Sequence, residues 1–141
     1  MKRPLFYAMT ATWGLPLTLC GALVAITLCL AGCRPTRYHG AWLFTLGRYW
    51  GGFSLGPVLL SAEDASDQLR RHELGHAIQN VRYGPMILPL VLLSVIRYHL
   101  REERARRGLP LTPYDSWWFE AEATRLGTAA VSADRHREDR S

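Results

Sequence analysis

The chain begins with an uncharged stretch long enough to cross a bilayer. Residues 4–33 contain no charged side chain, and leucine, alanine, valine and isoleucine predominate from about residue 13 onwards. A transmembrane helix needs about twenty such residues. The pattern predicts an N-terminal transmembrane helix within a membrane anchor over residues 1–36. The alternative is a lipoprotein signal peptide, because Leu30-Ala31-Gly32-Cys33 fits the pattern of small residues that ends in a lipidated cysteine. However, the segment is long for a signal peptide, and cationic residues flank it on both sides.

Residues 41–60 change to a pattern typical of strands. Aromatic and aliphatic residues fill 41–46 and 53–60, and Gly51-Gly52 between them is a turn signal. We therefore expect an antiparallel hairpin just outside the bilayer. It would either form a wall of an active-site cleft, with an edge open to an extended peptide, or only cover the helix that follows.

Two helices are expected next. Ser61-Ala62-Glu63-Asp64 has the form of a capping box and Gly84-Pro85 is a terminator, so the first helix should cover 62–82. Residues 86–100 are apolar up to Ile96 and basic afterwards. Eleven apolar residues are too few to span a bilayer alone, so a buried or interfacial helix is expected there.

A last helix is predicted over residues 113–126. Thr112 would be its N-cap, Pro113 its first residue and Gly127 the glycine after its end. The charged tail, 128–141, is expected to be disordered. The predicted fold is mainly α with a small β-hairpin, in which one small domain over 37–127 follows the anchor.

Charge and cysteine content exclude two classes of function. The formal net charge is +5, but the basic residues flank apolar segments or lie in the tail, without interleaved aromatic residues. Membrane flanking explains this distribution better than nucleic-acid binding does. The three cysteines, Cys20, Cys29 and Cys33, are odd in number and lack C-x-x-C spacing, so neither a disulfide framework nor a cysteine-type zinc site is expected.

One stretch of the chain specifies a chemistry: His72-Glu73-Leu74-Gly75-His76. Residues four apart lie on one face of a helix, so His72 and His76 can bind one metal ion. Glu73 lies beside that face and can act as a general base. H-E-x-x-H is the pattern of zinc hydrolases. The metzincin continuation would need glycine at 79 and histidine at 82, and the chain has Gln79 and Arg82.

A third ligand must therefore come from another segment, and Glu120 fits best. Glu120 and Glu122 lie about 200° apart on a helix, so only one can face the metal. The face of Glu120 carries small residues, namely Ser116, Ala123, Thr124 and Gly127. The face of Glu122 carries bulky ones, namely Trp118, Arg125 and Leu126. Small residues allow the close approach that a shared metal requires, whereas Asp115 suits a helix cap or an outer-shell partner of a ligand histidine.

These motifs resemble the gluzincin class of zinc metallopeptidases, in which H-E-x-x-H precedes E-x-x-A. More narrowly, residues 50–127 resemble small, uncharacterised bacterial membrane proteins with an H-E-x-G-H-x-x-Q-N element, here 72–80, and a W-F-E-x-x-A-T element, here 118–124. The resemblance implies a minimal zincin-like metal-binding domain over 37–127, with Glu120 as the third zinc ligand. It also implies a tyrosine or histidine that stabilises the oxyanion, for which Tyr114 and His99 are candidates. Gluzincins usually have aspartate where this chain has Thr124.

The leading hypothesis is a membrane-anchored zinc metallopeptidase of the bacterial cell membrane, acting on a peptide or protein. Zn²⁺ would be held by His72, His76 and Glu120, with Glu73 as the base. The alternative is a non-catalytic membrane-associated module, in which zinc joins two helices and the protein binds a partner. Structural zinc sites are usually cysteine-rich, which disfavours it. Hydrolysis of a substrate other than a peptide is a third possibility.

Overall fold

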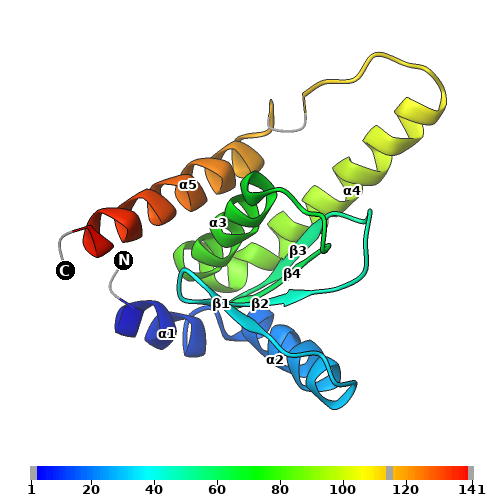
Figure 1. Ribbon diagram of the computed structural model, residues 1–141. Helices are drawn as coiled ribbons and strands as arrows, with labels where there is room; N and C mark the ends of the chain where they lie inside the picture. The colour runs from blue at the N-terminus through cyan, green and yellow to red at the C-terminus, as the bar shows by residue number, and fades with distance from the viewer. Residues whose placement is uncertain (1–2, 114–115, 140–141) are drawn as a thin grey trace.

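The computed structural model describes residues 3–113 and 116–139, and most of them are helical (Figure 1). This confirms the predicted mainly α class. In chain order the elements are α1 (Arg3–Ala11), α2 (Leu15–Leu30), β1 (Thr36–Tyr38), β2 (Ala41–Thr45), β3 (Gly52–Leu55), β4 (Val58–Ser61), α3 (Asp67–Tyr83), the short 3₁₀ helix η1 (Gly84–Met86), α4 (Ile87–Arg106) and α5 (Trp118–Glu138).

The sheet is mixed and has the strand order β1-β2-β4-β3. Strands β2 and β4 run parallel, with Leu43 opposite Leu59. The antiparallel hairpin predicted over residues 41–60 is therefore wrong. The antiparallel pairs are β1 with β2 and β3 with β4.

Turn geometry explains this difference. His39 and Gly40, between β1 and β2, both have positive φ, as a type I′ turn requires. Gly56, between β3 and β4, has positive φ and precedes Pro57, which fits a type II′ turn. These two tight turns divide the chain into hairpins, and Gly52 instead becomes the first residue of β3.

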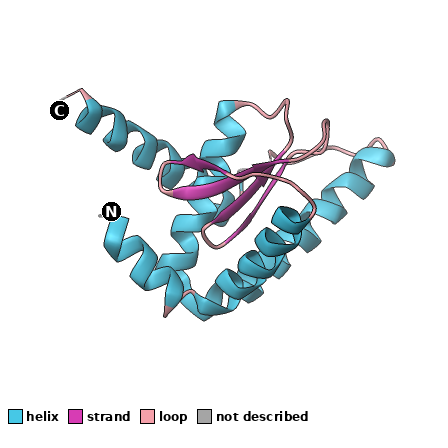
Figure 2. Cartoon of the chain, turned by 60° about the horizontal axis from the view of Figure 1, so that its bottom comes forward, coloured by secondary structure: helices cyan, strands magenta, loops and turns pink. Residues whose placement is uncertain are grey.

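The helices and the sheet form layers (Figures 1 and 2). Leu43 and Leu59 of the sheet pack with Leu74 of α3 in the main core. Below the sheet in Figure 1, α2 approaches β3 so closely that a Cβ on Gly21 would lie 2.2 Å from the carbonyl oxygen of Leu55. Helix α5 packs along α3 on the side away from the sheet.

Helix α3 begins five residues later than the predicted start at Ala62. Ser61 is not its N-cap, because it belongs to β4 and lies opposite Thr45 of β2. The N-cap is Ser66, whose hydroxyl accepts a hydrogen bond from the backbone N–H of Leu69 at 3.1 Å. The helix ends before Gly84, which has a φ of 55°, as the terminator predicts.

Helices α4 and α5 are both longer than predicted. Helix α4 continues beyond residue 100 to Arg106. Helix α5 begins at Trp118 and not at 113, so Thr112 does not cap it, and it runs through Gly127 to Glu138. The predicted end at Gly127 is therefore wrong, and so is disorder for the described part of the tail. The physical reason is packing, since a Cβ on Gly127 would lie 1.7 Å from the carbonyl oxygen of Arg71.

The apolar helices are not one straight anchor. Helices α1 and α2 meet at an angle of 97°, and α2 has 16 residues. Among the described residues, the stretch Asp67–Arg106 is long and apolar enough to cross a membrane, and only 11% of its apolar window is buried. Core helices of soluble proteins can reach the same length and composition, but they are mostly buried.

Candidate metal centre

Helices α3 and α5 touch backbone to backbone. A Cβ on Gly75 of α3 would lie 1.8 Å from the carbonyl oxygen of Ala123 on α5, and Gly127 makes the reciprocal approach to α3. The small-residue face predicted for α5 is therefore the face that meets α3. This close contact brings Glu120 to the two histidines of the H-E-x-x-H element.

The three predicted ligand atoms form a nearly equilateral triangle. Nε2 of His72 and Nε2 of His76 lie 3.1 Å and 3.2 Å from Oε2 of Glu120, and 3.1 Å from each other. A tetrahedral zinc ion with ligands at about 2.05 Å would hold them about 3.3 Å apart. The donor set and its spacing therefore fit a zinc ion, although other divalent cations accept the same donors.

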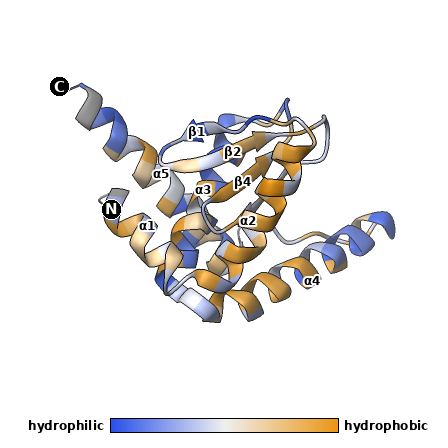
Figure 3. Ribbon diagram, turned by 90° about the horizontal axis from the view of Figure 1, so that it is seen from below, coloured by the Kyte–Doolittle hydropathy of each residue, from blue (hydrophilic) through white to orange (hydrophobic). Residues whose placement is uncertain are grey.

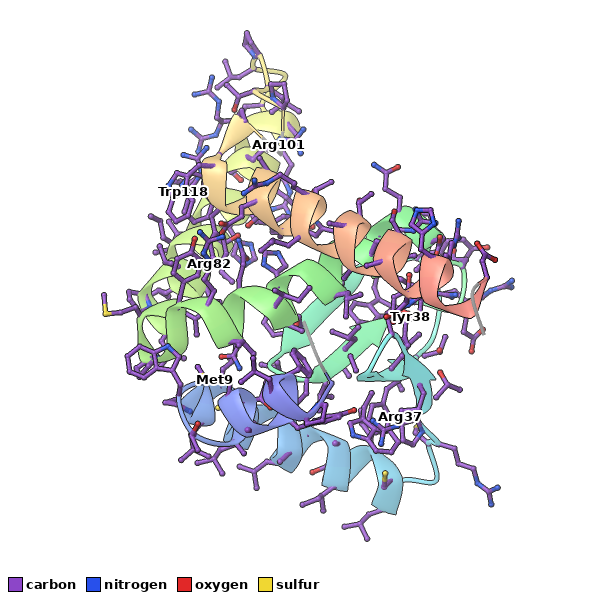
Figure 4. All side chains as sticks on the ribbon, turned by 90° about the vertical axis from the view of Figure 1, so that its left-hand side faces the viewer. Met9, Arg37, Tyr38, Arg82, Arg101 and Trp118 are labelled. Carbon is purple, nitrogen blue, oxygen red and sulfur yellow. The ribbon has the colours of Figure 1, made fainter. Side chains whose placement is uncertain are left out.

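Glu122 points away from this triangle. Its carboxylate accepts hydrogen bonds from the side chains of Gln79, Arg82 and Tyr83. Arg82 lies beside Trp118 at the same end of the α3–α5 pair in Figure 4. Burial alone would raise the pKa of Glu122, but the hydrogen bonds from Tyr83 and Gln79 and the charge of Arg82 hold it below its ordinary value.

The proton on His76 can be assigned from its neighbours. Gln79 uses its amide nitrogen to donate to the carbonyl oxygen of Phe119 and to Glu122, so its oxygen faces Nδ1 of His76 at 2.8 Å. An amide oxygen only accepts, so Nδ1 of His76 must carry the proton. In the neutral ring, Nε2 then presents a lone pair to the triangle.

The same reasoning applies to His72. The hydroxyl of Thr124 donates to the carbonyl oxygen of Glu120 at 3.2 Å, so it accepts from Nδ1 of His72 at 2.9 Å. Two imidazole lone pairs and one carboxylate oxygen therefore converge. Three acceptors this close repel one another unless added protons or a cation lie between them.

The electrostatics of the triangle favour positive charge. Glu120 is 2% exposed, and its other oxygen accepts a hydrogen bond from the Ser94 hydroxyl. Burial would raise the pKa of Glu120. When the rings of His72 and His76 also carry a proton on Nε2, the hydrogen bonds that they donate outweigh burial and hold this pKa well below its ordinary value. Burial would lower the pKa of His76, but Glu120 and Glu73 reverse that effect and raise it.

Glu73 lies beside the triangle and at the edge of a cavity. It is 5% exposed and borders a cavity of about 500 Å³ that also contains His72 and His76. Burial raises its pKa, and the neighbouring His76 and His72 partly offset that increase. Its carboxylate packs on Gly52 of β3, where an added Cβ would lie 2.9 Å from Oε1. Strand β3 thus forms one wall of the cavity, which is one of the two roles considered for the predicted hairpin.

The remaining candidates have different outcomes. His99 and its neighbour Tyr98 line the same cavity as Glu73. The hydroxyl of Tyr98 donates to Glu102 at 2.9 Å. Tyr114 and Asp115 lie outside the described residues.

Sequence reasoning missed three contacts around the site. Gln79 supports His76, Ser94 supports Glu120, and Thr124 supports His72. Gln79 could have been found from its spacing, because it lies three residues after His76 on the same helix. Ser94 could not, because its contact depends on how α4 packs.

Comparison of the chain with protein-family models, curated proteins and solved structures gave no match. The resemblance to gluzincins therefore rests on the motif residues alone.

Proposed function

We propose that the chain is a membrane-associated, zinc-dependent peptide hydrolase. The observation that supports this most is that two imidazole nitrogens and one carboxylate oxygen converge, while the other polar atom of each of these three side chains already has a hydrogen-bond partner. Both Nδ1 atoms and the second oxygen of Glu120 have their own partners, which orients the remaining three atoms toward one point. Such outer contacts are typical of metal ligands.

The residues divide the chemistry among themselves. His72, His76 and Glu120 would hold zinc, which when bound polarises a carbonyl group and lowers the pKa of water toward neutrality. Glu73 accepts the proton of the attacking water on its carboxylate and passes it to the leaving amine. This role requires a carboxylate next to the ligands and open to the cavity, which is the position of Glu73.

The sheet supplies a place for an extended substrate. Within the described residues, β3 pairs only with β4, so its other edge has unpaired backbone groups. The cavity is lined by residues 52–54 of β3 and by Gly51, which precedes the strand. A peptide could add to this edge as a further strand, with its scissile bond near Glu73.

A non-catalytic zinc module remains the second candidate, because the triangle joins α3 to α5. In that case zinc would stabilise the fold, and Glu73 would have no chemical role. The buried position of Glu73 beside the cavity favours hydrolysis, since a glutamate without a task would seldom be kept in an apolar wall.

The test is a comparison of metal content and turnover in purified protein. We expect about one zinc per chain in the native protein and loss of zinc in His76→Ala, with His136→Ala as the matched exposed control. Glu73→Gln should retain zinc and lose at least about 100-fold of the cleavage of fluorogenic casein, whereas Glu63→Gln should not change it.

Two outcomes would contradict the proposal. Zinc content unaffected by His76→Ala would remove the metal site. Retained zinc with turnover unchanged in Glu73→Gln would remove the base. If the native protein and Glu73→Gln both lack cleavage activity, and removal of zinc by a chelator unfolds the protein, the structural module is correct.

A further inference from the structure

The outer faces of α2 and α4 form an exposed apolar surface, called the α2–α4 surface below. It is represented by Leu19, Leu23 and Ile26 of α2 and by Leu88, Leu92 and Ile96 of α4. Leu23 is 67% exposed and Leu92 is 62% exposed. Figure 3 shows the apolar residues of α2 and of the first half of α4 on the same side of the molecule. Large exposed apolar patches mark surfaces that contact a partner or a membrane.

Cationic residues border this surface. Helix α4 has no charged residue before Arg97, and five arginines stand against two glutamates over residues 97–107. Arg34 and Arg37 follow α2, and the guanidinium of Arg37 lies 3.3 Å from the ring centroid of Trp42. Arginines and aromatic rings at the edge of an apolar face are typical of proteins that lie on anionic bilayers.

The same arginines argue against a second copy of the chain as the partner. A second copy would present the same apolar residues and the same excess of arginines, and therefore no net negative charge that complements them. An anionic headgroup layer complements both parts of the surface, the apolar residues and the arginines.

The proposed metal centre lies near the point on α4 where the apolar residues end and the arginines begin. The Ser94 hydroxyl donates to Glu120, and Arg97 follows three residues later, which is about 4.5 Å along a helix. The cavity beside the centre is walled by Leu17 of α2 and by Val91 and Val95 of α4. The helices that present the apolar surface therefore also form the wall of the cavity.

We propose that the α2–α4 surface docks on a bilayer containing anionic phospholipid, with the cavity opening at the boundary between acyl chains and headgroups. Leucines of α2 and the first half of α4 enter the apolar layer, and the arginines after Ile96 contact lipid phosphates. Docking itself is independent of hydrolysis. Its consequence for substrate choice, a polypeptide segment held at the membrane surface, rests on the proposed peptidase.

Spin labels measure the depth directly. In full-length protein with Cys20, Cys29 and Cys33 replaced by serine, single cysteines are introduced as Leu92→Cys, Arg104→Cys and Thr128→Cys, and the protein is reconstituted into vesicles of phosphatidylcholine and phosphatidylglycerol. A label at 92 should collide mainly with oxygen, one at 128 mainly with a water-soluble nickel chelate, and one at 104 to an intermediate degree. Equal collision with the nickel chelate at 92 and 128 would overturn the docking geometry.

Lipid charge is tested by competition between vesicles of phosphatidylcholine alone and vesicles that also contain phosphatidylglycerol. Each arginine at an anionic surface contributes about 1 kcal/mol, so Arg104→Gln/Arg106→Gln/Arg107→Gln should reduce the preference for anionic vesicles about 100-fold. The matched control, Arg48→Gln/Arg125→Gln/Arg135→Gln, removes the same charge elsewhere and should change it less than about threefold. Equal losses in the two variants would overturn the proposal. Neither measurement requires turnover, so a negative result here is separate from failure of the peptidase proposal.

Discussion

The α3–α5 interface and the α2–α4 surface differ in packing, because the first is a tight contact with buried polar side chains and the second exposes apolar side chains. At the α3–α5 interface, glycines bring two backbones into contact, and buried polar side chains pair with one another around Glu120. On the α2–α4 surface, leucines such as Leu23 and Leu92 are mostly exposed. The first region depends on the exact shape of its residues, whereas the second depends only on their being apolar. Substitutions should therefore separate the two regions by the size and kind of effect.

The largest effect is expected from Gly75→Ala. Alanine normally stabilises a helix relative to glycine by about 1 kcal/mol. Here the added Cβ would lie 1.8 Å from the backbone oxygen of Ala123, which cannot move aside as a side chain can. We expect the opposite sign, with a loss of about 3 kcal/mol in the free energy of unfolding, measured by denaturant titration in detergent.

Ser132→Ala, at an exposed position of α5, is the control for helix propensity and should leave stability unchanged or raise it slightly. If Gly75→Ala were as stable as Ser132→Ala, the close contact between α3 and α5 would not exist. The proposed metal centre would then lack the geometry on which it depends.

A smaller effect is expected from Thr124→Val. The hydroxyl of Thr124 accepts from Nδ1 of His72, and valine keeps the shape but removes the acceptor. Loss of such an outer partner typically lowers metal affinity by about 10- to 100-fold, which a competing zinc chelator can measure. Thr128→Val is the matched control, because Thr128 makes only the ordinary bond to the carbonyl oxygen four residues earlier among the described contacts.

Equal zinc affinity in Thr124→Val and Thr128→Val would show that His72 is not oriented by Thr124. The α3–α5 interface would then be a packed interface without a tuned polar network. The α3–α5 interface would then resemble the α2–α4 surface in that it would not depend on specific polar contacts.

The sequence contains most of the information about the α3–α5 interface. The i, i+4 spacing of the histidines and the small residues beside Glu120 predict which faces meet, and the structure brings those faces together. This succeeded because helix periodicity maps sequence spacing onto a face without knowledge of the rest of the fold. The predicted helix end at Gly127 is wrong because a packing glycine and a terminating glycine are identical in sequence.

The sheet could not be predicted in the same way. Pairing of β2 with β4 in parallel is a contact between segments that are not adjacent in the chain, and periodicity gives no register for it. Two turns competed with Gly51-Gly52, and only the backbone angles of His39, Gly40 and Gly56 show which ones form. The contact of Ser94 with Glu120 likewise depends on the path of α4 after Pro85.

The smallest effect is expected from Leu92→Ala on the α2–α4 surface. Its side chain is already 62% exposed, so the change should alter the free energy of unfolding in detergent by less than about 0.5 kcal/mol. The same truncation in the core, Leu74→Ala, removes a side chain that is 2% exposed and should cost about 2–5 kcal/mol. The same truncation of a leucine would thus distinguish an exposed position from a buried one.

If Leu92→Ala were as costly as Leu74→Ala, Leu92 would pack against protein, and the α2–α4 surface would be an internal interface and not one that faces lipid. If it is nearly neutral in detergent yet weakens partition into anionic vesicles, the apolar residues of α4 stabilise membrane contact and not the fold.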